Sequence, residues 1–296
     1  MAYKFEHGET VPQNVKRIAA EEIGSAIDYL RGKGGVNGDE SIHETRKCIK
    51  KTRALIRLVR PELGDFYVEE NVQLRDTGRK LSELRDAGAL ICSLDQVRKR
   101  TNGSAARPFA TVRRRLTRQK QQIEQQVEAG KLKPSLAAGL VTARKTIKYW
   151  PLEADGFQAI EPGMEKTFRD GRKALRQARK TGSREDFHEW RKRVKDLWYQ
   201  IRLLEKVWGE VMKAYERSLK ELEDALGEDL NLAILAERAQ SMATDNGNRL
   251  KMGPVTKVIE ASRKELRERA LEIGERVYAE KPRDFVRRIK QLWKAW

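Results

Sequence analysis

One segment of this chain occurs twice, and the repeat constrains the fold more than any other feature. Residues 43–59 read HETRKCIKKTRALIRLV and residues 188–204 read HEWRKRVKDLWYQIRLL, with eight of seventeen positions identical at an offset of 145 residues. The same offset relates LSELRDAGAL at 81–90 to LGEDLNLAIL at 226–235 without a gap. Because this offset is close to half of the 296 residues, we infer an internal duplication with its join within residues 149–163.

The residues between the loops predict helices along the whole chain. Glu, Lys, Arg, Ala and Leu dominate, and runs of β-branched residues are missing. Ser41 and Ser183 are expected to cap the N-termini of the helices that follow them. We predict an all-α protein packed as antiparallel helical bundles, in which residues 1–155 and 156–296 are the two halves and the two repeated helices are related by pseudo-twofold symmetry. The expected helices are about 12–31, 41–60, 65–99, 105–129, 134–149, 160–180, 184–207, 209–242, 254–279 and 282–294.

The chain has a large excess of positive charge. It contains 62 Lys and Arg against 44 Asp and Glu, a formal net charge of +18. An excess of this size predicts a polyanionic partner, such as nucleic acid, an anionic membrane or a phosphate polymer. Charged residues make up 36% of the chain, so acids are also numerous and the positive excess must be concentrated locally.

Cysteine content and hydropathy indicate the compartment. Cys48 and Cys92 form no zinc-binding spacing and fit a reducing environment. No apolar run approaches the length of a membrane span, and the N-terminal segment lacks the hydrophobic region of a signal peptide. We therefore expect a cytoplasmic protein with no membrane partner, no metal and no cofactor.

A helical projection separates charge from apolar residues in both repeated segments. At ~100° per residue, the cations of the first copy fall within roughly 80° of one direction, opposite Ile42, Ile49 and Ile56. An ordinary solvated face mixes signs, whereas these faces hold one sign apart from Glu44 and Glu189 in the first turns, where the helix dipole favours acids. The candidate binding residues are His43, Arg46, Lys47, Lys50, Arg53 and Arg57, with His188, Arg191, Lys192, Lys195 and Arg202.

The length of the first basic stripe indicates the kind of ligand. Fourteen steps from His43 to Arg57 span ~21 Å of helix, which suits a linear polyanion better than a single phosphate. Two such helices could line one groove with two basic walls. Further candidates, in sets whose residues project from several helix faces, are Lys16, Arg17, Arg113, Arg114, Arg115, Arg118, Arg169, Arg172, Lys173 and Arg176.

Two of the three histidines are repeat equivalents. His43 and His188 begin the two basic segments, whereas no role is assigned to His7. Three roles are open: a hydrogen bond to a phosphate oxygen, a structural contact to a backbone group, and acid–base catalysis. Metal binding is disfavoured because no HxxxH or HExxH spacing is present.

The segments IHETRKCIKKTRALIRLV and FHEWRKRVKDLWYQIRLL, each followed by a Leu-x-x-Leu-Arg-Asp-like stretch, resemble the CHAD (conserved histidine α-helical domain) family over essentially the whole chain. This resemblance implies two four-helix bundles, a basic central groove and binding of inorganic polyphosphate without catalysis. Two departures are visible. Ser82 stands where the family has Gly, and Leu230 and Asn231 stand where the first half has Arg85 and Asp86.

Three functions are compared. Non-enzymatic polyphosphate binding, with a location at polyphosphate granules in the cytoplasm, is the first prediction. The alternative is binding to an RNA or DNA backbone. Single-strand binders usually interleave several aromatic residues with their cations. Here Trp198, the repeat equivalent of Arg53, is the one aromatic residue that borders the basic arc. An enzyme is the third, and the basic faces lack the clustered carboxylates that phosphoryl transfer uses. The oligomeric state is left open.

Overall fold

The computed structural model describes residues 3–36, 38–99, 106–129, 131–244 and 253–296. Within these ranges every regular element is a helix. The α-helices are α1 (Val11–Leu30), α2 (Gly38–Leu58), α3 (Arg60–Leu63), α4 (Asp65–Lys80), α5 (Ser82–Lys99), α6 (Ala106–Ala129), α7 (Leu132–Thr146), α8 (Glu161–Thr181), α9 (Arg184–Leu203), α10 (Gly209–Thr244), α11 (Gly253–Val277) and α12 (Pro282–Ala295). Three short 3₁₀ helices are η1 (Ile147–Tyr149), η2 (Phe157–Ala159) and η3 (Glu205–Val207).

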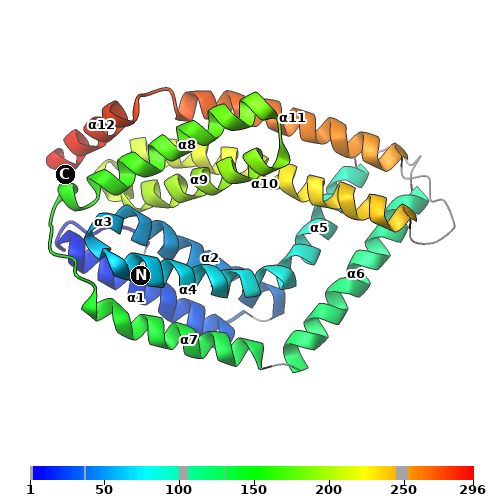
Figure 1. Cartoon of the computed structure of the whole chain (residues 1–296), viewed down its shortest axis with the longest axis horizontal. Helices are drawn as coiled ribbons and strands as arrows, with labels where there is room; N and C mark the ends of the chain where they lie inside the picture. The colour runs from blue at the N-terminus through cyan, green and yellow to red at the C-terminus, as the bar shows by residue number, and fades with distance from the viewer. Residues whose placement is uncertain (1–2, 37, 100–105, 130, 245–252) are drawn as a thin grey trace.

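The helices form two groups joined at one side. In Figure 1, α8 to α12 lie above α1 to α4 and α7, and α5 and α6 form a pair at the right that reaches from the lower group to α10 and α11. Helix α2 of the lower group and helix α9 of the upper group pack against each other at the centre, where the two groups meet. The predicted all-α class is confirmed, and the central position of α2 and α9 brings the two repeated segments together.

Helix boundaries follow recognisable capping signals at some positions. Thr10 and Gln13 form a capping box at the start of α1. Ser183 caps α9 as predicted, since its side chain accepts a hydrogen bond from the Asp186 backbone N–H. The prediction for Ser41 is wrong: α2 already begins at Gly38, and the Ser41 hydroxyl donates to the Tyr29 carbonyl.

The lengths of corresponding helices agree at the 145-residue offset, with one difference. Helix α9 begins and ends within one residue of the positions 145 after those of α2. Helix α10 is continuous, whereas the corresponding stretch of the first half, predicted as one helix over 65–99, divides into α4 and α5 around Leu81. At this break the Gly78 carbonyl accepts hydrogen bonds from the Arg46 guanidinium and the Ser82 hydroxyl, at 2.6 and 3.0 Å. Side-chain donors thus occupy a carbonyl that normally serves the helix ladder.

Two buried clusters hold the helices together. The larger contains the apolar faces of α1, α2, α8 and α9, including Leu55, Ile56 and Ile201, which are all fully buried. The smaller joins α5, α6, α10 and α11 through residues such as Phe109 and Leu235. Burial of these faces fixes which sides of α2 and α9 remain accessible, and Arg46, Lys50 and Arg191 lie on those sides.

Candidate functional site: a basic cleft between α2, α9 and α10

Two adjoining cavities lie between α2, α9 and α10. The first has a volume of about 450 Å³ and the second about 400 Å³. Lys50, Arg191 and Asn231 line both, so the cavities are neighbours, and together they are called the central cleft here. Its other charged or histidine lining residues are Arg46, Arg184, Glu185 and His188 in the first cavity, and His43, Lys47, Lys195, Lys220, Glu223, Asp224 and Glu228 in the second.

Helix α2 supplies one wall of the cleft. Arg46 is held by the Gly78 carbonyl at 2.6 Å and by the Ser82 hydroxyl, so the Ser82 departure provides an anchor for this guanidinium. Lys47 pairs with Glu44 at 3.0 Å, and the His43 Nε2 lies 3.7 Å from the same carboxylate. The three- and four-residue spacing of these side chains places them on one helix face.

Helix α9 supplies the facing wall with His188, Arg191 and Lys195. The Nδ1 atom of His188 is buried, and no hydrogen-bond partner for it occurs among the described residues. Burial, followed by the neighbouring charges of Lys192 and Arg191, lowers the pKa of His188 to about 4. The imidazole is therefore neutral at pH 7.

The acid Glu223 on α10 joins the two cations of α9, and sequence reasoning missed it. Its Oε1 lies 2.8 Å from both Arg191 Nη2 and Lys195 Nζ, and its side chain is only 6% exposed. Burial raises the pKa of Glu223, but the charges of Arg191 and Lys195 outweigh this and lower it to about 2. The sequence of α9 places only cations on this face, but Glu223 from the neighbouring α10 partly neutralises their charge. Lys220 and Arg184 were likewise not among the predicted residues, because neither lies within the repeated stripe.

Arg53 and Arg57 lie on α2 but do not line the cleft. The Arg53 guanidinium donates to Asn71 Oδ1 at 3.1 Å, and that of Arg57 donates to Asp196 Oδ1 at 2.7 Å. Burial and the charge of Arg57 lower the pKa of Arg53 to about 10. The cleft closes here because α2 and α9 come into direct contact, where the fully buried Gln200 donates to the Ala54 carbonyl at 3.2 Å.

Two predicted residues of α9 also lie outside the lining of the cleft. Lys192 is exposed and pairs with Glu189 at 2.8 Å. Arg202 pairs with Glu216 at 3.2 Å, and its guanidinium lies 5.3 Å from the Trp198 ring centroid. Trp198 itself lines the second cavity. The repeat equivalents Lys47 and Lys192 therefore occupy different surroundings.

The further candidates are dispersed over the outside of the molecule. Lys16 donates to the Lys148 carbonyl at 3.3 Å, and Arg17 pairs with Glu9 at 2.8 Å. Arg113 pairs with Asp95 at 2.9 Å. None of the further candidates lines the central cleft; they lie on α1 (Lys16, Arg17), on α6 (Arg113, Arg114, Arg115, Arg118) and on α8 (Arg169, Arg172, Lys173, Arg176).

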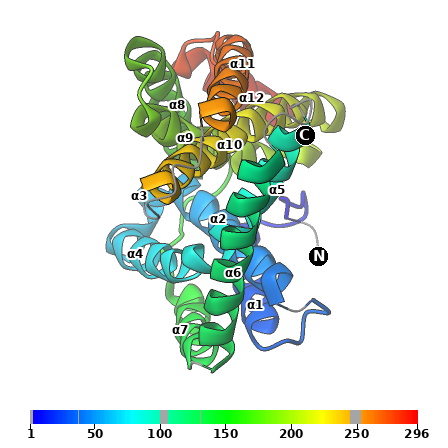
Figure 2. The same cartoon turned by 90° about the vertical axis from the view of Figure 1, so that its right-hand side faces the viewer.

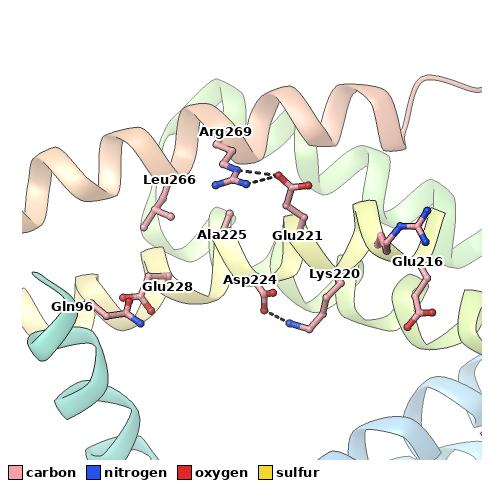
Figure 3. Close-up of a pocket in the computed structure, with 10 residues that line it drawn as sticks. Gln96, Glu216, Lys220, Glu221, Asp224, Ala225, Glu228, Leu266 and Arg269 are labelled. Carbon is pink, nitrogen blue, oxygen red and sulfur yellow. Dashed lines mark hydrogen bonds and ion pairs between the residues drawn. The ribbon is translucent and has the colours of Figure 1, made fainter. Parts of the chain in front are cut away.

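A third cavity, of about 690 Å³, continues from the second along α10 towards α11 and is shown in Figure 3. Lys220, Asp224 and Glu228 line both cavities. Glu216 and Glu221 add further acids, and Glu221 pairs with Arg269 at 2.6 Å. The positive lining of the cleft thus ends at an acid-rich neighbour.

The described residues hold no group of three or more His, Cys, Asp or Glu side chains placed to bind a metal ion. The same part of the chain includes no helix with the length and apolarity needed to span a membrane. The side chains of Arg85 and Asp86, the pair noted in sequence, lie outside the described part.

The fold and the site define an all-helical protein whose central cleft is lined by cations and histidine from two helices. The CHAD domain family model matches residues 23–240, and this chain belongs to that family. The crystal structure of the CHAD domain from the plant Ricinus communis has the same fold, with a TM-score of 0.58 and 14% sequence identity over 90% of this chain and 91% of that chain. No curated protein sequence matches the chain.

Proposed function

We propose that this protein binds inorganic polyphosphate in the central cleft and does not turn it over. The observation that carries the proposal is the convergence of Arg46, Lys47 and Lys50 from α2 with Arg191 and Lys195 from α9 on two adjoining cavities. Arginine forks match phosphate oxygens, and lysine adds compact positive charge. Family membership is consistent with this ligand.

The shape of the cleft favours a chain of phosphates over a single one. Lys50 and Arg191 line both of its cavities, so that successive phosphates would meet successive cations. Each contact is modest because ion pairs within the protein already hold several of these cations, and a polymer sums many contacts. Binding should weaken with rising salt through counterion release.

Polyphosphate is favoured over single-stranded nucleic acid because the described lining of the cleft offers no free aromatic face. Trp198 is 9% exposed, its ring stacks on that of Tyr199 at a centroid distance of 4.7 Å, and Arg202 lies over it. Base stacking needs an accessible ring. Binding without turnover is favoured because two carboxylates of the lining are already held by cations, Glu223 by Arg191 and Lys195 and Asp224 by Lys220.

We further propose that residues 1–155 and 156–296 descend from a duplication and form the two pseudo-twofold-related bundles. The agreement of α2 with α9 supports this. A second pair of contacts also supports it. Ser82 contacts Arg46, and their repeat equivalents Gly227 and Arg191 lie against each other as well. A cytoplasmic location at polyphosphate granules would follow from this ligand.

A competition titration tests the function. Labelled long-chain polyphosphate is bound to the full chain at about 0.15 M salt and displaced with unlabelled polyphosphate, single-stranded RNA or duplex DNA. We expect polyphosphate to displace the label at a much lower phosphate concentration than either nucleic acid. Equal displacement per phosphate would show a general polyanion binder. Shortening of the chains during hours with Mg²⁺ would show an enzyme.

A further inference from the structure

A second concentration of positive charge lies on the outer side of α8. From residue 169 to residue 180, the residues within roughly 60° of one direction are all cations, at ~100° per residue. The opposite side of the helix is buried through Phe168, Gly171, Leu175 and Ala178. The α8 basic face is defined as Arg169, Arg172, Lys173, Arg176, Arg179 and Lys180.

Most of this face has no acidic partner. Arg169 pairs with Glu165, and Arg179 pairs with Glu275. For the other four cations, no ion pair or side-chain hydrogen bond is formed with any described residue, and three of the four are exposed. Like charges three and four residues apart destabilise a helix, so a bound polyanion would relieve a cost that the free protein carries.

The fold itself does not require this charge. Helix α1 precedes α2 as α8 precedes α9, and the six positions of α1 and its following loop at the 145-residue offset include only one cation. These positions are Gly24, Ile27, Asp28, Arg31, Gly34 and Gly35. The basic face is therefore a property of the second half alone.

The α8 basic face is connected to the central cleft through the turn between α8 and α9. Lys180 lies in the last turn of α8, Gly182 makes the turn with φ of 63°, and Arg184 begins α9. Arg184 lines the first cavity of the cleft. Helix α8 lies at the periphery of the molecule beside α9 (Figures 1 and 2). Lys180 and Arg184 thus flank the turn that joins the basic face to the cleft, and Arg184 itself pairs with Glu237 on α10.

We propose that the α8 basic face is a second polyphosphate-binding surface, which holds the part of a long chain that leaves the cleft past Arg184. This inference rests on the proposed function of the cleft. From Arg169 to Lys180 the face extends over ~16 Å of helix, which suits several successive phosphates. It contains no aromatic residue on which a base could stack. The apolar side of α8 is buried in the core, so it is not available for insertion into a membrane.

The test compares a short and a long ligand on one variant. The outer variant combines Arg172→Gln, Lys173→Gln, Arg176→Gln and Lys180→Gln, which removes only the four cations without acidic partners. The control variant combines Lys33→Gln, Lys131→Gln, Lys133→Gln and Lys145→Gln, with the same change in charge on the α1 and α7 side of the molecule. Circular dichroism melts establish that both variants fold. Inorganic tripolyphosphate is too short to occupy both surfaces at once and should bind chiefly in the cleft, whereas long-chain polyphosphate can span both.

For the outer variant we expect the Kd of tripolyphosphate to stay within about twofold of the control and that of long-chain polyphosphate to rise about tenfold or more. The slope of log Kd against log salt for the long chain should fall by about 3, at ~0.7 per lost phosphate contact. Equal Kd values of the outer and control variants for long-chain polyphosphate would overturn the proposal. An equal loss of affinity for tripolyphosphate and long-chain polyphosphate in the outer variant would also overturn it. A loss of RNA binding alone would make the face a nucleic-acid site. Failure of the cleft itself is recognised separately, because the wild-type chain would then not bind tripolyphosphate.

Discussion

The Arg57 guanidinium on α2 donates to the Asp196 carboxylate on α9 at a distance of 2.7 Å. The two side chains are 19% and 12% exposed, so this ion pair is largely shielded from water. Arg193 also approaches Asp196, at 4.0 Å. The pair lies where α2 and α9 make direct contact, and it therefore fixes the relative position of the two helices that line the cleft.

Replacement of Asp196 should destabilise the fold. The substitution Asp196→Ala leaves Arg57 largely buried without its acid and close to Arg53, and we expect a loss of about 2–4 kcal/mol in the free energy of unfolding. Urea unfolding measures this loss. Asp284→Ala, which removes the partner of Arg287 in an exposed pair at 3.1 Å, is the matched control and should cost under about 1 kcal/mol. Similar losses for both variants would contradict the assigned role of Asp196.

Gly163 is required where the start of α8 packs on the end of α2. A Cβ atom there would lie 1.9 Å from the Leu58 carbonyl oxygen and 2.8 Å from that of Arg57, and backbone atoms cannot rotate away. We expect Gly163→Ala to lower the free energy of unfolding by about 1–3 kcal/mol or more. In Gly139→Ala on α7, the nearest atom would be 3.9 Å away, so this control should be neutral or slightly stabilising. Thermal melts of both variants provide the comparison.

Glu223 should make stability depend on pH in the acid range. Its folded-state pKa of about 2 lies below the unfolded value of about 4.3, so its contribution is complete above about pH 4.3 and is lost as the pH falls towards 2. The wild-type chain should lose about 2–3 kcal/mol in this window from this group. Glu223→Gln should lack that component. Parallel stability curves for the two proteins below pH 4.3 would show that the carboxylate is not held by Arg191 and Lys195.

His188 should couple polyphosphate binding to protonation. Its folded-state pKa of about 4 lies below the unfolded value of about 6.5, so its contribution to stability is complete above about pH 6.5 and falls as the pH is lowered towards 4. A bound polyanion would raise this pKa, so affinity should increase as the pH falls through the same window. His188→Gln should show a flatter dependence of Kd on pH, whereas His7→Gln should behave as wild type. An unchanged profile in His188→Gln would favour a purely structural role.

The sequence predicted the helices and the walls of the candidate site through local periodicity. The three- and four-residue spacing of His43, Arg46, Lys47 and Lys50 identified a helix face, and the repeat identified α9 as its counterpart. The structure places both faces on one cleft. These features were accessible because they depend on neighbours within one or two helix turns.

Other features depend on contacts between segments distant in sequence. A helical projection does not indicate that Glu223 on α10 contacts Arg191. Nor does it indicate that α2 packs against α9 beyond Lys50, where Arg57 pairs with Asp196. The break at Leu81 was not predicted, because the Gly78 carbonyl is occupied by Arg46 from another helix. On α8 the cations were recognised as candidates, but the expectation that they project from several helix faces was wrong: a projection of residues 169–180 places them on one face, opposite the buried side.

The most direct measurement of the central claim is the affinity for long-chain polyphosphate after removal of charge from the cleft. The cleft variant combines Lys47→Gln, Lys50→Gln and Lys220→Gln, which leaves the buried Glu223 with both of its cations. Its control combines Lys33→Gln, Lys131→Gln and Lys133→Gln. At about 0.15 M salt, titration calorimetry should give a Kd at least about tenfold higher for the cleft variant and within about twofold of wild type for the control. Equal affinities of the two variants would contradict binding in the central cleft.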